Sequence, residues 1–336
     1  MIKNKISIAI PVLNEGRNIG KCLSIIYNQN YNKKLIEVII VDAGSTDRTM
    51  EIVKKFSKYG VKILDNSLKK DYDTGKMIAL KKAAGEFFMY LDADMFLDSN
   101  NWIKKMIVPF SNKNISATFT KFVVKINDNA LNRYLSYDSL QRDPLYKFLT
   151  PGIESVIVKK EDSFYLCKLR LNNPPPIGLC LYRTELLKRF FKGDRFQDLE
   201  VPLKLLIEGY GYFAYIPNTG VHHAHVNNIK HLIKKRMRNI NIMNDNTRGY
   251  IPDYEKRLFK WVDFTKKSSI LKIGLWVIYA NLLIPLFISG IYKMLKYKDG
   301  CFMLEPVVGL AVTDSVLWSF IKNRQGLKII SGTKNK

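Results

Sequence analysis

Residues 87–94 read Phe87-Phe88-Met89-Tyr90-Leu91-Asp92-Ala93-Asp94, an apolar run that ends in two carboxylates. A short apolar run of this kind is typical of a buried strand in a parallel sheet. In open α/β sheets, ligands bind outside the carboxyl ends of such strands. Two carboxylates there suit a hard divalent cation, Mn²⁺ or Mg²⁺, which shares its remaining positions with phosphate oxygens. The alternative is a turn in which the acids cap the next helix, because Asp is common at helix N-termini.

The segments on either side of this stretch alternate between strands and helices. Apolar runs predict strands over residues 6–13, 36–42, 61–64 and 87–91. Helical spacing and cap signals predict helices over residues 18–28, 48–59 and 77–84. This order predicts an α/β fold with a doubly wound, mainly parallel sheet, flanking helices and right-handed crossovers.

The composition of the 336-residue chain is that of a globular protein with a large basic excess. Its 54 basic and 30 acidic residues give a net charge of +24, which favours polyanions such as nucleic acid, an anionic membrane or phosphorylated substrates. Much of the excess lies after residue 229 beside long apolar segments, and the sequence has no zinc-finger, RRM or helix-turn-helix signature. We therefore expect a membrane partner and no nucleic acid. The four cysteines lack metal-ligand spacing, which predicts buried thiols in a reducing compartment.

Five motifs occur in the order of a known family. They are Pro11-Val12-Leu13-Asn14-Glu15, Val41-Asp42-Ala43-Gly44-Ser45-Thr46-Asp47-Arg48-Thr49, Ala83-Ala84-Gly85-Glu86, Leu91-Asp92-Ala93-Asp94 and Gln197-Asp198-Leu199-Glu200-Val201-Pro202-Leu203. With them the chain, over about residues 5–240, resembles a glycosyltransferase family 2 domain, which has the GT-A fold. The resemblance implies inverting, metal-dependent transfer of a sugar from a nucleotide-sugar donor, a UDP- or GDP-sugar.

The donor site implied by the resemblance lies where the first strands end. Glu15 and Asp42 can accept hydrogen bonds from ribose hydroxyls and a base N–H, and in the family these positions line the nucleotide pocket. Lys76 follows Gly75 near a helix start, where a cation is well placed for phosphate oxygens. The alternatives are helix capping for the two acids and a solvated surface position for Lys76. Further donor contacts are expected from residues of the same motifs: Pro11, Asn14, Gly44, Asp92 and Ala93.

The metal site implied by the resemblance centres on Asp92 and Asp94, which match the metal motif of the family. A divalent cation there, Mn²⁺ or Mg²⁺, neutralises charge on the departing nucleoside diphosphate. In some relatives a histidine completes the metal or diphosphate site, which makes His223 and His225 candidate ligands. Their alternative role is packing against the sheet.

The catalytic base implied by the resemblance is Asp198, which would deprotonate the acceptor hydroxyl. Its alternative role is to cap a helix expected over residues 198–208. Glu200 falls where a second acid often follows, and Gly178 and Arg183 resemble the segment that borders the acceptor. The Gln-X-X-Arg-Trp motif of processive synthases is absent from the sequence, so transfer of a single sugar fits better than polymerisation.

The C-terminal third is first basic and then apolar. Segment 229–243 predicts a basic amphipathic helix, placed either at a membrane interface or against the catalytic domain. Segments 273–291 and 302–321 approach the roughly 20 residues that cross a hydrocarbon core. Lysines between them favour interfacial or re-entrant helices over a complete span. The expected regions are a catalytic domain, an interfacial region and membrane-anchoring helices, at residues 1–228, 229–270 and 271–330.

These apolar segments suggest a membrane-embedded acceptor. We expect a polyprenyl or dolichyl phosphate, or a saccharide linked to one, glycosylated at the cytosolic face in cell-surface glycan or protein glycosylation. The alternatives are an anchored enzyme that acts on a soluble or protein acceptor, a nucleotidyltransferase, and a scaffold without catalysis. A nucleotidyltransferase usually has a glycine-rich phosphate loop after its first strand, which Pro11 to Glu15 do not form. A scaffold would lack metal or base residues, and both are present.

Overall fold

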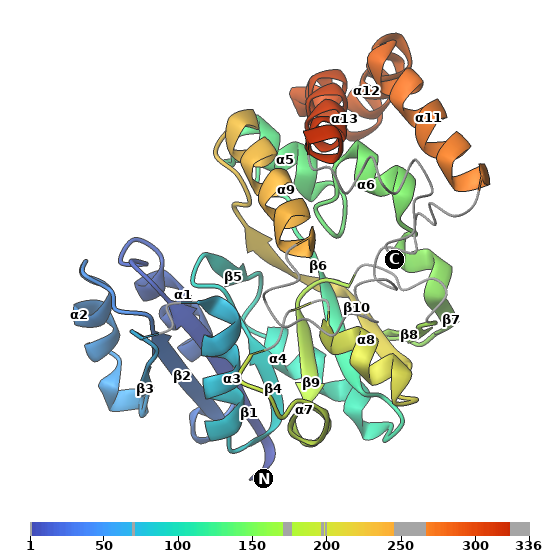
Figure 1. Cartoon of the computed structure of the whole chain (residues 1–336). Coiled ribbons are helices and arrows are strands. Elements are labelled where there is room, and N and C mark those ends of the chain that lie inside the picture. Colours follow the sequence, from blue (N-terminus) through green and yellow to red (C-terminus); the bar gives the residue numbers. More distant parts are fainter. Residues whose placement is uncertain are drawn as a thin grey trace, which may run out of the picture. The chain divides into compact units, whose positions relative to one another are not determined.

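The computed structural model describes residues 2–68, 71–170, 177–195, 198, 200–244 and 267–322. The chain forms two compact units, one of residues 1–123 and 153–223, and one of residues 124–152 and 224–336. Figure 1 shows that the first unit is built around a sheet and that the second is helical. This grouping differs from the predicted ranges because residues 124–152 cluster with the C-terminal helices.

A ten-stranded sheet forms the core of the first unit. Its order is β3-β2-β1-β4-β9-β6-β10-β8-β7, with β5 paired to β10. The strands are β1 (Ile2–Val12), β2 (Ile36–Asp42), β3 (Lys62–Asp65), β4 (Gly85–Tyr90), β5 (Met95–Leu97), β6 (Ala117–Phe122), β7 (Ile157–Lys160), β8 (Tyr165–Lys168), β9 (Cys180–Arg183) and β10 (Tyr212–His223). Strands β3, β2, β1 and β4 pair in parallel, as do β6 and β10. The other pairs are antiparallel, so the predicted α/β fold is parallel in its N-terminal half and mixed beyond it.

Burial explains why the first strands lie close to their predicted ranges. Strand β2 has the predicted bounds, and all its residues except Asp42 are buried. Its register with β1 pairs Ile8 with Val38 and Ile10 with Ile40, and these side chains belong to one core cluster. A strand that is buried on both faces of the sheet has a nearly continuous apolar sequence, and such a run can be recognised without the structure.

Helices of the first unit connect these strands. They are α1 (Ile19–Tyr27), α2 (Thr49–Lys54), α3 (Tyr72–Lys82), α4 (Trp102–Ile107), α7 (Thr184–Phe190) and α8 (Glu200–Ile207). Helix α3 begins five residues before its predicted start because the Asp71 carboxylate caps it, accepting a hydrogen bond from the Thr74 amide at 2.8 Å. Lys76 therefore lies inside a helix, not just before one.

The second unit packs helices around an apolar core that includes Leu135, Leu232, Trp276 and Phe302. Ion pairs brace it, among them a buried one in which Arg236 Nε lies 2.7 Å from Asp143 Oδ2 and a partly buried one in which Arg133 Nε lies 2.9 Å from Asp299 Oδ2. The helices are α5 (Ala130–Ser136), α6 (Pro144–Leu149), α9 (Ile229–Asn244), α11 (Lys267–Asn281), α12 (Ile284–Tyr297) and α13 (Glu305–Lys322).

Helix α9 matches the predicted amphipathic segment 229–243 closely. Lys230 and Lys234 are exposed, whereas Arg236 is buried against Asp143 and Leu232 is fully buried in the core of the second unit. Arg236 is thus not available to a lipid surface. Residues 245–266, which make up most of the rest of the predicted interfacial region, lie outside the described residues.

The predicted apolar segment 273–291 is broken in two. Helices α11 and α12 meet at a bend of 74° next to Leu283, whose φ is +57°, and Pro285 starts the second helix without an amide donor. Among the described residues, the helix Gly300–Ser319 is long and apolar enough to cross a membrane, and the bent pair passes the same test only if taken as one span.

Candidate functional site

The two carboxylates of the opening motif lie at the carboxyl edge of the sheet, where β1, β2 and β4 end. The Leu91 amide donates to Ala9 O at 2.9 Å, which extends the pairing of β4 with β1 up to Asp92. The Met95 amide then donates to Asp92 O at 2.9 Å, and the chain continues into β5. The alternative role of these acids, capping a helix, is not seen because a strand follows them.

Strand pairing brings His223 to Asp94. In the antiparallel pair of β5 and β10, His223 is opposite Met95. Its Nε2 lies 3.7 Å from Asp94 Oδ2, and its ring lies against Phe122 with centroids 5.8 Å apart. The structure therefore joins two of the predicted metal-binding groups. His225 lies beyond the end of β10, in the second unit, and is not placed relative to Asp94.

A loop next to these acids is shaped by the predicted nucleotide-binding residues. Asn14, with φ of +58°, accepts hydrogen bonds through Oδ1 from the amides of Thr46 at 2.8 Å and Asp47 at 3.3 Å. Asp42 Oδ1 accepts from the Ser45 hydroxyl at 2.6 Å, and Gly44 adopts φ of +88°. Asp42 thus caps a tight turn rather than a helix, and the turn lies at the end of β2.

Glu15 lies between this loop and Asp94. Its carbonyl accepts from the amides of Asn18 and Ile19 at 2.9 Å, which starts α1. Burial raises the pKa of the Glu15 carboxyl; a hydrogen bond from Asn18 lowers it, and the nearby charge of Asp94 raises it further. Glu15 therefore combines the predicted capping role with a carboxylate that faces the acidic edge.

Pro11 and Gly75 set how closely α3 approaches β1. A Cβ on Gly75 would lie 3.2 Å from Pro11 Cβ, closer than most real contacts, so glycine lets the helix pack directly on the strand. This approach carries the next residue of α3, Lys76, over the carboxyl edge. Ala93 is buried in the core beneath it.

Lys76 is the buried cation of the site. The residue is 4% exposed, and its Nζ donates to Asp198 and, at 3.1 Å, to Asp73 Oδ1. The ammonium also lies 4.9 Å from the centre of the Tyr90 ring. Burial lowers the pKa of Lys76, but the carboxylates of Asp198 and Asp73 outweigh it and raise the pKa above its usual value. The alternative of a solvated lysine is therefore wrong: Lys76 stays charged and binds the predicted base.

Three aromatic residues of the site were not predicted from sequence. Partial burial raises the pKa of the Tyr72 phenol, and the carboxylates of Asp92 and Glu15 raise it further, which places Tyr72 among the acids. Tyr90 and Tyr182 stack with ring centroids 6.3 Å apart beside Lys76. Asp71, three residues before Thr74, is the helix-cap signal that could have revealed Tyr72 and Asp73 as part of a site-forming helix.

The predicted acceptor residues are divided between the two edges of the sheet. Gly178 precedes β9, whose start lies near the end of β4, on the carboxyl edge. Glu200 begins α8, two residues after Asp198. Arg183 is paired with Phe87 at the start of β4, about 16 Å along the strand from Asp92. The structure does not bring Arg183 together with the acids.

The donor set at the carboxyl edge can hold part of a metal shell. Carboxylate oxygens and one imidazole suit Mn²⁺ or Mg²⁺, and Asp92, Asp94 and His223 supply them. Within the described residues, no group of three or more such side chains is already arranged around a metal position. A cation held here would need further ligands from a bound phosphate or water.

The family described as Glycosyl transferase family 2 matches residues 7–162, which contain the second half of β1, strands β2 to β4 and both acids of the opening motif. This part of the chain, 156 of its 336 residues, is therefore similar to family 2 glycosyltransferases. Glycosyltransferase AglE of Haloferax volcanii is 29% identical over 140 residues, which is 40% of this chain and 46% of AglE. The Escherichia coli protein WfgD, named a UDP-Glc:α-D-GlcNAc-diphosphoundecaprenol β-1,3-glucosyltransferase, is 25% identical over 211 residues, 58% of this chain and 82% of WfgD. The chain thus spans less than half of AglE.

Solved structures share the fold of this chain at low sequence identity. The mannosyltransferase PcManGT from Pyrobaculum calidifontis, in complex with GDP-Man and Mn²⁺, has a TM-score of 0.53 and 17% identity, covering 94% of this chain and 87% of PcManGT. TarS 1–349 of S. aureus, in complex with UDP, has a TM-score of 0.50 and 14% identity, covering 99% and 93%. The GT-A fold expected from the motifs is confirmed.

Proposed function

We propose that this chain is a metal-dependent, inverting glycosyltransferase that moves one sugar from a UDP- or GDP-sugar to a lipid-linked acceptor at the cytosolic face of a membrane. One observation carries the proposal: buried Lys76 binds the candidate base Asp198 at the same sheet edge that holds Asp92 and Asp94. Sugar transfer from a nucleoside diphosphate needs a base for the acceptor and positive charge for the diphosphate. In a family 2 domain, the residues at this edge of the sheet can supply both.

The donor would bind along the loop between β1 and α2. Glu15 and the turn built by Asn14, Asp42 and Gly44 offer acceptors and amides to the nucleoside. The names of WfgD and PcManGT, which state UDP-Glc and GDP-Man, support a nucleotide diphosphate sugar as donor.

A divalent cation would be held by Asp92, Asp94 and His223 and would neutralise charge on the leaving diphosphate. PcManGT was solved with Mn²⁺, which supports such a cation here. Lys76 lies close to the same edge and can add a positive charge for phosphate oxygens. Because its pKa is raised, Lys76 keeps that charge throughout the neutral and mildly alkaline range.

Asp198 would take the proton of the acceptor hydroxyl. Its side chain is 60% exposed, so an acceptor can reach it, and the ammonium of Lys76 donates a hydrogen bond to its carboxylate. Attack from the side opposite the diphosphate inverts the anomeric centre. When diphosphate oxygens approach Lys76, they compete for the same ammonium and free Asp198 to act as base.

The lipid-linked acceptor is supported by the name of WfgD and by apolar residues of the second unit. Helices α11 and α12, with the two residues between them, expose a series of large apolar side chains: Ile270, Leu271, Leu275, Ile278, Leu282, Leu283, Ile284, Phe287, Ile288, Tyr292 and Leu295. Exposed apolar patches on this scale mark membrane or protein contacts. Lys230 and Lys234 would add attraction to an anionic leaflet.

The test is an assay of the full chain with UDP-, GDP- and dTDP-sugars, each offered to a polyprenyl phosphate, a lipid-linked saccharide or a water-soluble sugar acceptor. We expect transfer to a lipid-linked acceptor that requires Mn²⁺ or Mg²⁺, with inverted anomeric configuration in the product by NMR. Full activity in EDTA would contradict the metal, and equal transfer to soluble acceptors would favour an enzyme that the second unit only anchors.

A further inference from the structure

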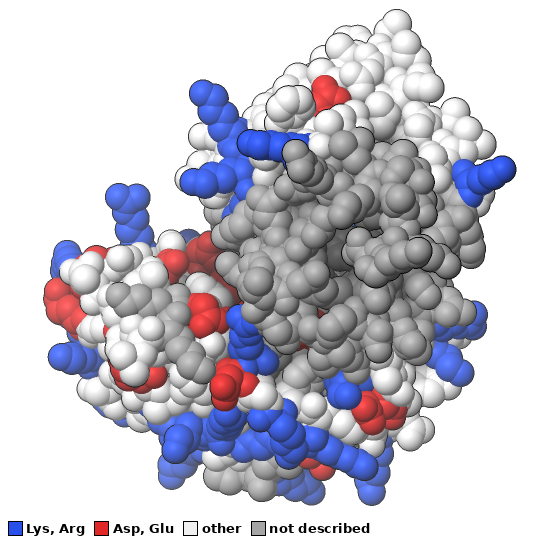
Figure 2. All heavy atoms as spheres, in the orientation of Figure 1, with Lys and Arg blue, Asp and Glu red and all other residues white. Residues whose placement is uncertain are grey.

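A cavity lined by polar and charged side chains lies at the amino edge of the sheet, opposite the acids. It has a volume of about 230 Å³ and is bordered by the starts of β6 and β10, the end of β9 and helix α7. Figure 2 shows Lys and Arg side chains gathered at the end of the first unit where Figure 1 places the N-terminus and α7. The lining residues are Lys113, Ile115, Ser116, Arg183, Glu185, Leu186, Arg189 and Tyr210.

Arg183 is held rigidly at this cavity. Its Nε donates to Ile115 O at 2.8 Å and its Nη2 to Phe110 O at 2.9 Å, and its guanidinium stacks on the Phe110 ring. Among the described residues, Nη1 has no acceptor. Burial lowers the pKa of Arg183, an effect that a nearby Glu185 carboxylate opposes, so an anion would relieve the cost of keeping this charge partly buried.

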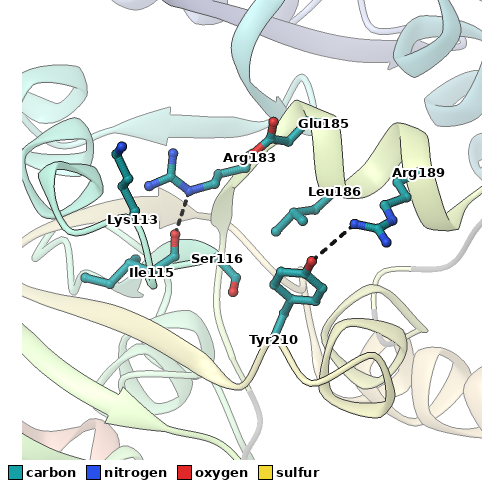
Figure 3. Close-up of a pocket in the computed structure, with 8 residues that line it drawn as sticks. All are labelled: Lys113, Ile115, Ser116, Arg183, Glu185, Leu186, Arg189 and Tyr210. Atoms are coloured by element: carbon teal, nitrogen blue, oxygen red, sulfur yellow. Dashed lines mark hydrogen bonds between the residues drawn. The ribbon is translucent and has the colours of Figure 1, made fainter.

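Two further cations and a hydroxyl complete the lining. Figure 3 shows Lys113 on the side of Arg183, and Arg189 with Tyr210 on the other side, with Ser116 between them. Arg189 Nη1 lies 3.4 Å from the Tyr210 hydroxyl, a weak hydrogen bond that a better acceptor could replace. With Glu185, the lining has three positive charges and one negative charge.

Ser116 supplies the observation that points to a ligand. The residue is 1% exposed, and its Oγ has no hydrogen-bond partner among the described residues. Its backbone is fixed, because Ser116 O accepts from the Arg183 amide at 3.1 Å and its amide donates to Tyr212 O at 2.9 Å. A buried hydroxyl without a partner costs free energy unless something in the cavity binds it.

We propose that this cavity binds a small phosphate-bearing anion. Arginine donors in fixed geometry and a hydroxyl are the groups that recognise phosphate oxygens. The volume is below the roughly 300–1,000 Å³ of typical ligand pockets, so a phosphate or the phosphate end of a larger molecule fits better than a whole nucleotide sugar. Because the cavity is about 16 Å along the sheet from Asp92, it is a separate site from the proposed transfer centre.

The test is calorimetric titration of the full-length protein with inorganic phosphate and with glucose 1-phosphate. Lys113→Gln/Arg189→Gln removes two cations that make no other strong contact within the described part of the chain, and we expect it to weaken binding at least tenfold. Arg183 is left intact because it also binds three main-chain carbonyls. Glu185→Gln should tighten binding several-fold by removing the opposing charge. The control Lys34→Gln/Lys54→Gln lowers net charge equally at exposed sites of the same unit and should bind as the wild type does.

Three results would overturn the proposal. The first is wild-type binding by the double variant, which would indicate an adventitious ion only. The second is unchanged binding by Ser116→Ala. The third is displacement of phosphate by saturating UDP with Mn²⁺, which would place the anion at the acidic edge. To distinguish a lipid headgroup from a soluble phosphate, binding of the protein is measured to phosphatidylcholine vesicles with and without polyprenyl phosphate. Binding of vesicles that depends on Lys113 and Arg189 indicates a lipid headgroup, and binding of the soluble probes alone indicates a soluble phosphate.

Discussion

The two edges of the sheet carry opposite arrangements of charge. At the carboxyl edge, acids surround one buried cation, Lys76, which binds Asp198 and Asp73. At the amino edge, cations surround a buried acid: Lys62 Nζ lies 2.6 Å and Lys5 Nζ 3.7 Å from Glu37 Oε1, and three more cations line the cavity there. At each edge the less common charge, Lys76 at one and Glu37 at the other, is buried and paired. We call it the minority charge; the more common, majority charge faces solvent or a ligand.

This contrast separates binding chemistry from stability. The buried minority charges are paired, and removing a partner of a buried charge costs more than removing an exposed one. The exposed majority charges, Asp94 and Asp198 at one edge and Arg189 at the other, can change partners when a ligand arrives. The predictions below test that separation.

Asp94→Ala should have the largest effect and reduce transfer below detection. It removes a carboxylate from the proposed metal site, whereas the fold should persist because Asp94 is partly exposed. Asp98→Ala is the matched control on the other side of β5 and should retain activity. Substantial transfer by Asp94→Ala, measured with radiolabelled donor at saturating Mn²⁺, would remove the metal from the proposal.

Asp198→Asn should lower kcat by roughly 10²–10⁴-fold, the usual contribution of a general base. Donor affinity should stay near the wild-type value, because the amide keeps the shape of the carboxylate and lies apart from the nucleoside loop. Asp194→Asn, an exposed acid 3.6 Å from Lys81, is the control. A collapse of donor affinity with an unchanged rate for bound donor would assign Asp198 to binding instead.

Lys76→Met should lower kcat/KM by about 10²-fold, as loss of one preorganised donor to a developing negative charge typically does. Both kcat and KM should change, because Lys76 would bind the donor diphosphate and also contacts the candidate base Asp198. Lys81→Met on the exposed side of the same helix should have little effect. If only the melting temperature falls and the kinetics of the folded fraction are normal, Lys76 is a structural residue alone.

Glu37→Gln should affect stability and leave kcat unchanged. Burial raises the pKa of Glu37, but hydrogen bonds from the Ala84 amide and Lys62 outweigh it and lower the pKa below its usual value. A lowered pKa stabilises the folded state above the unfolded-state pKa of about 4.3, and that stabilisation disappears as the pH falls through the folded-state pKa.

Urea unfolding should therefore show that Glu37→Gln costs about 2 kcal/mol at pH 7, as expected for hydrogen bonds to a charged group. The cost should shrink below about pH 4 as the wild-type carboxyl becomes protonated. Glu51→Gln, an exposed acid of α2, is the control. A cost that stays constant from pH 7 to pH 3 would show that shape, not charge, matters at Glu37.

The sequence was sufficient for elements whose signal is local. Strand β2 has its predicted bounds because its apolar run is continuous and Asp42 ends it. The start of α3 was missed because Tyr72 to Lys76 include glycine and polar residues that hide the helical period, and the cap at Asp71 decides the start. The short strands β7 and β8 carry several exposed residues, so pairing across the sheet defines them more than their own composition does.

Part of the site was predictable for the same reason. Asp92, Asp94 and Asp198 stand in motifs with a clear position at strand or helix ends, and the structure places them at one edge or beside its buried cation. Lys76 is buried and binds Asp198, which lies 122 positions away in sequence. This contact depends on the close approach of α3 to β1 at Gly75, which the sequence does not show. Arg183 was expected beside the acceptor from the resemblance alone, and the antiparallel pairing of β9 with β4, which the residues do not reveal, places it near the start of β4 instead.

All four cysteines are reduced and at most 2% exposed, three in the first unit and Cys301 in the second. Burial raises the pKa of Cys167, Cys180 and Cys301 to about 12, so hardly any thiolate exists at neutral pH in the folded state. Alkylating reagents should consequently modify the protein only when a unit opens. Mass spectrometry of the alkylated peptides would time the opening of each unit separately, with no label added to the chain.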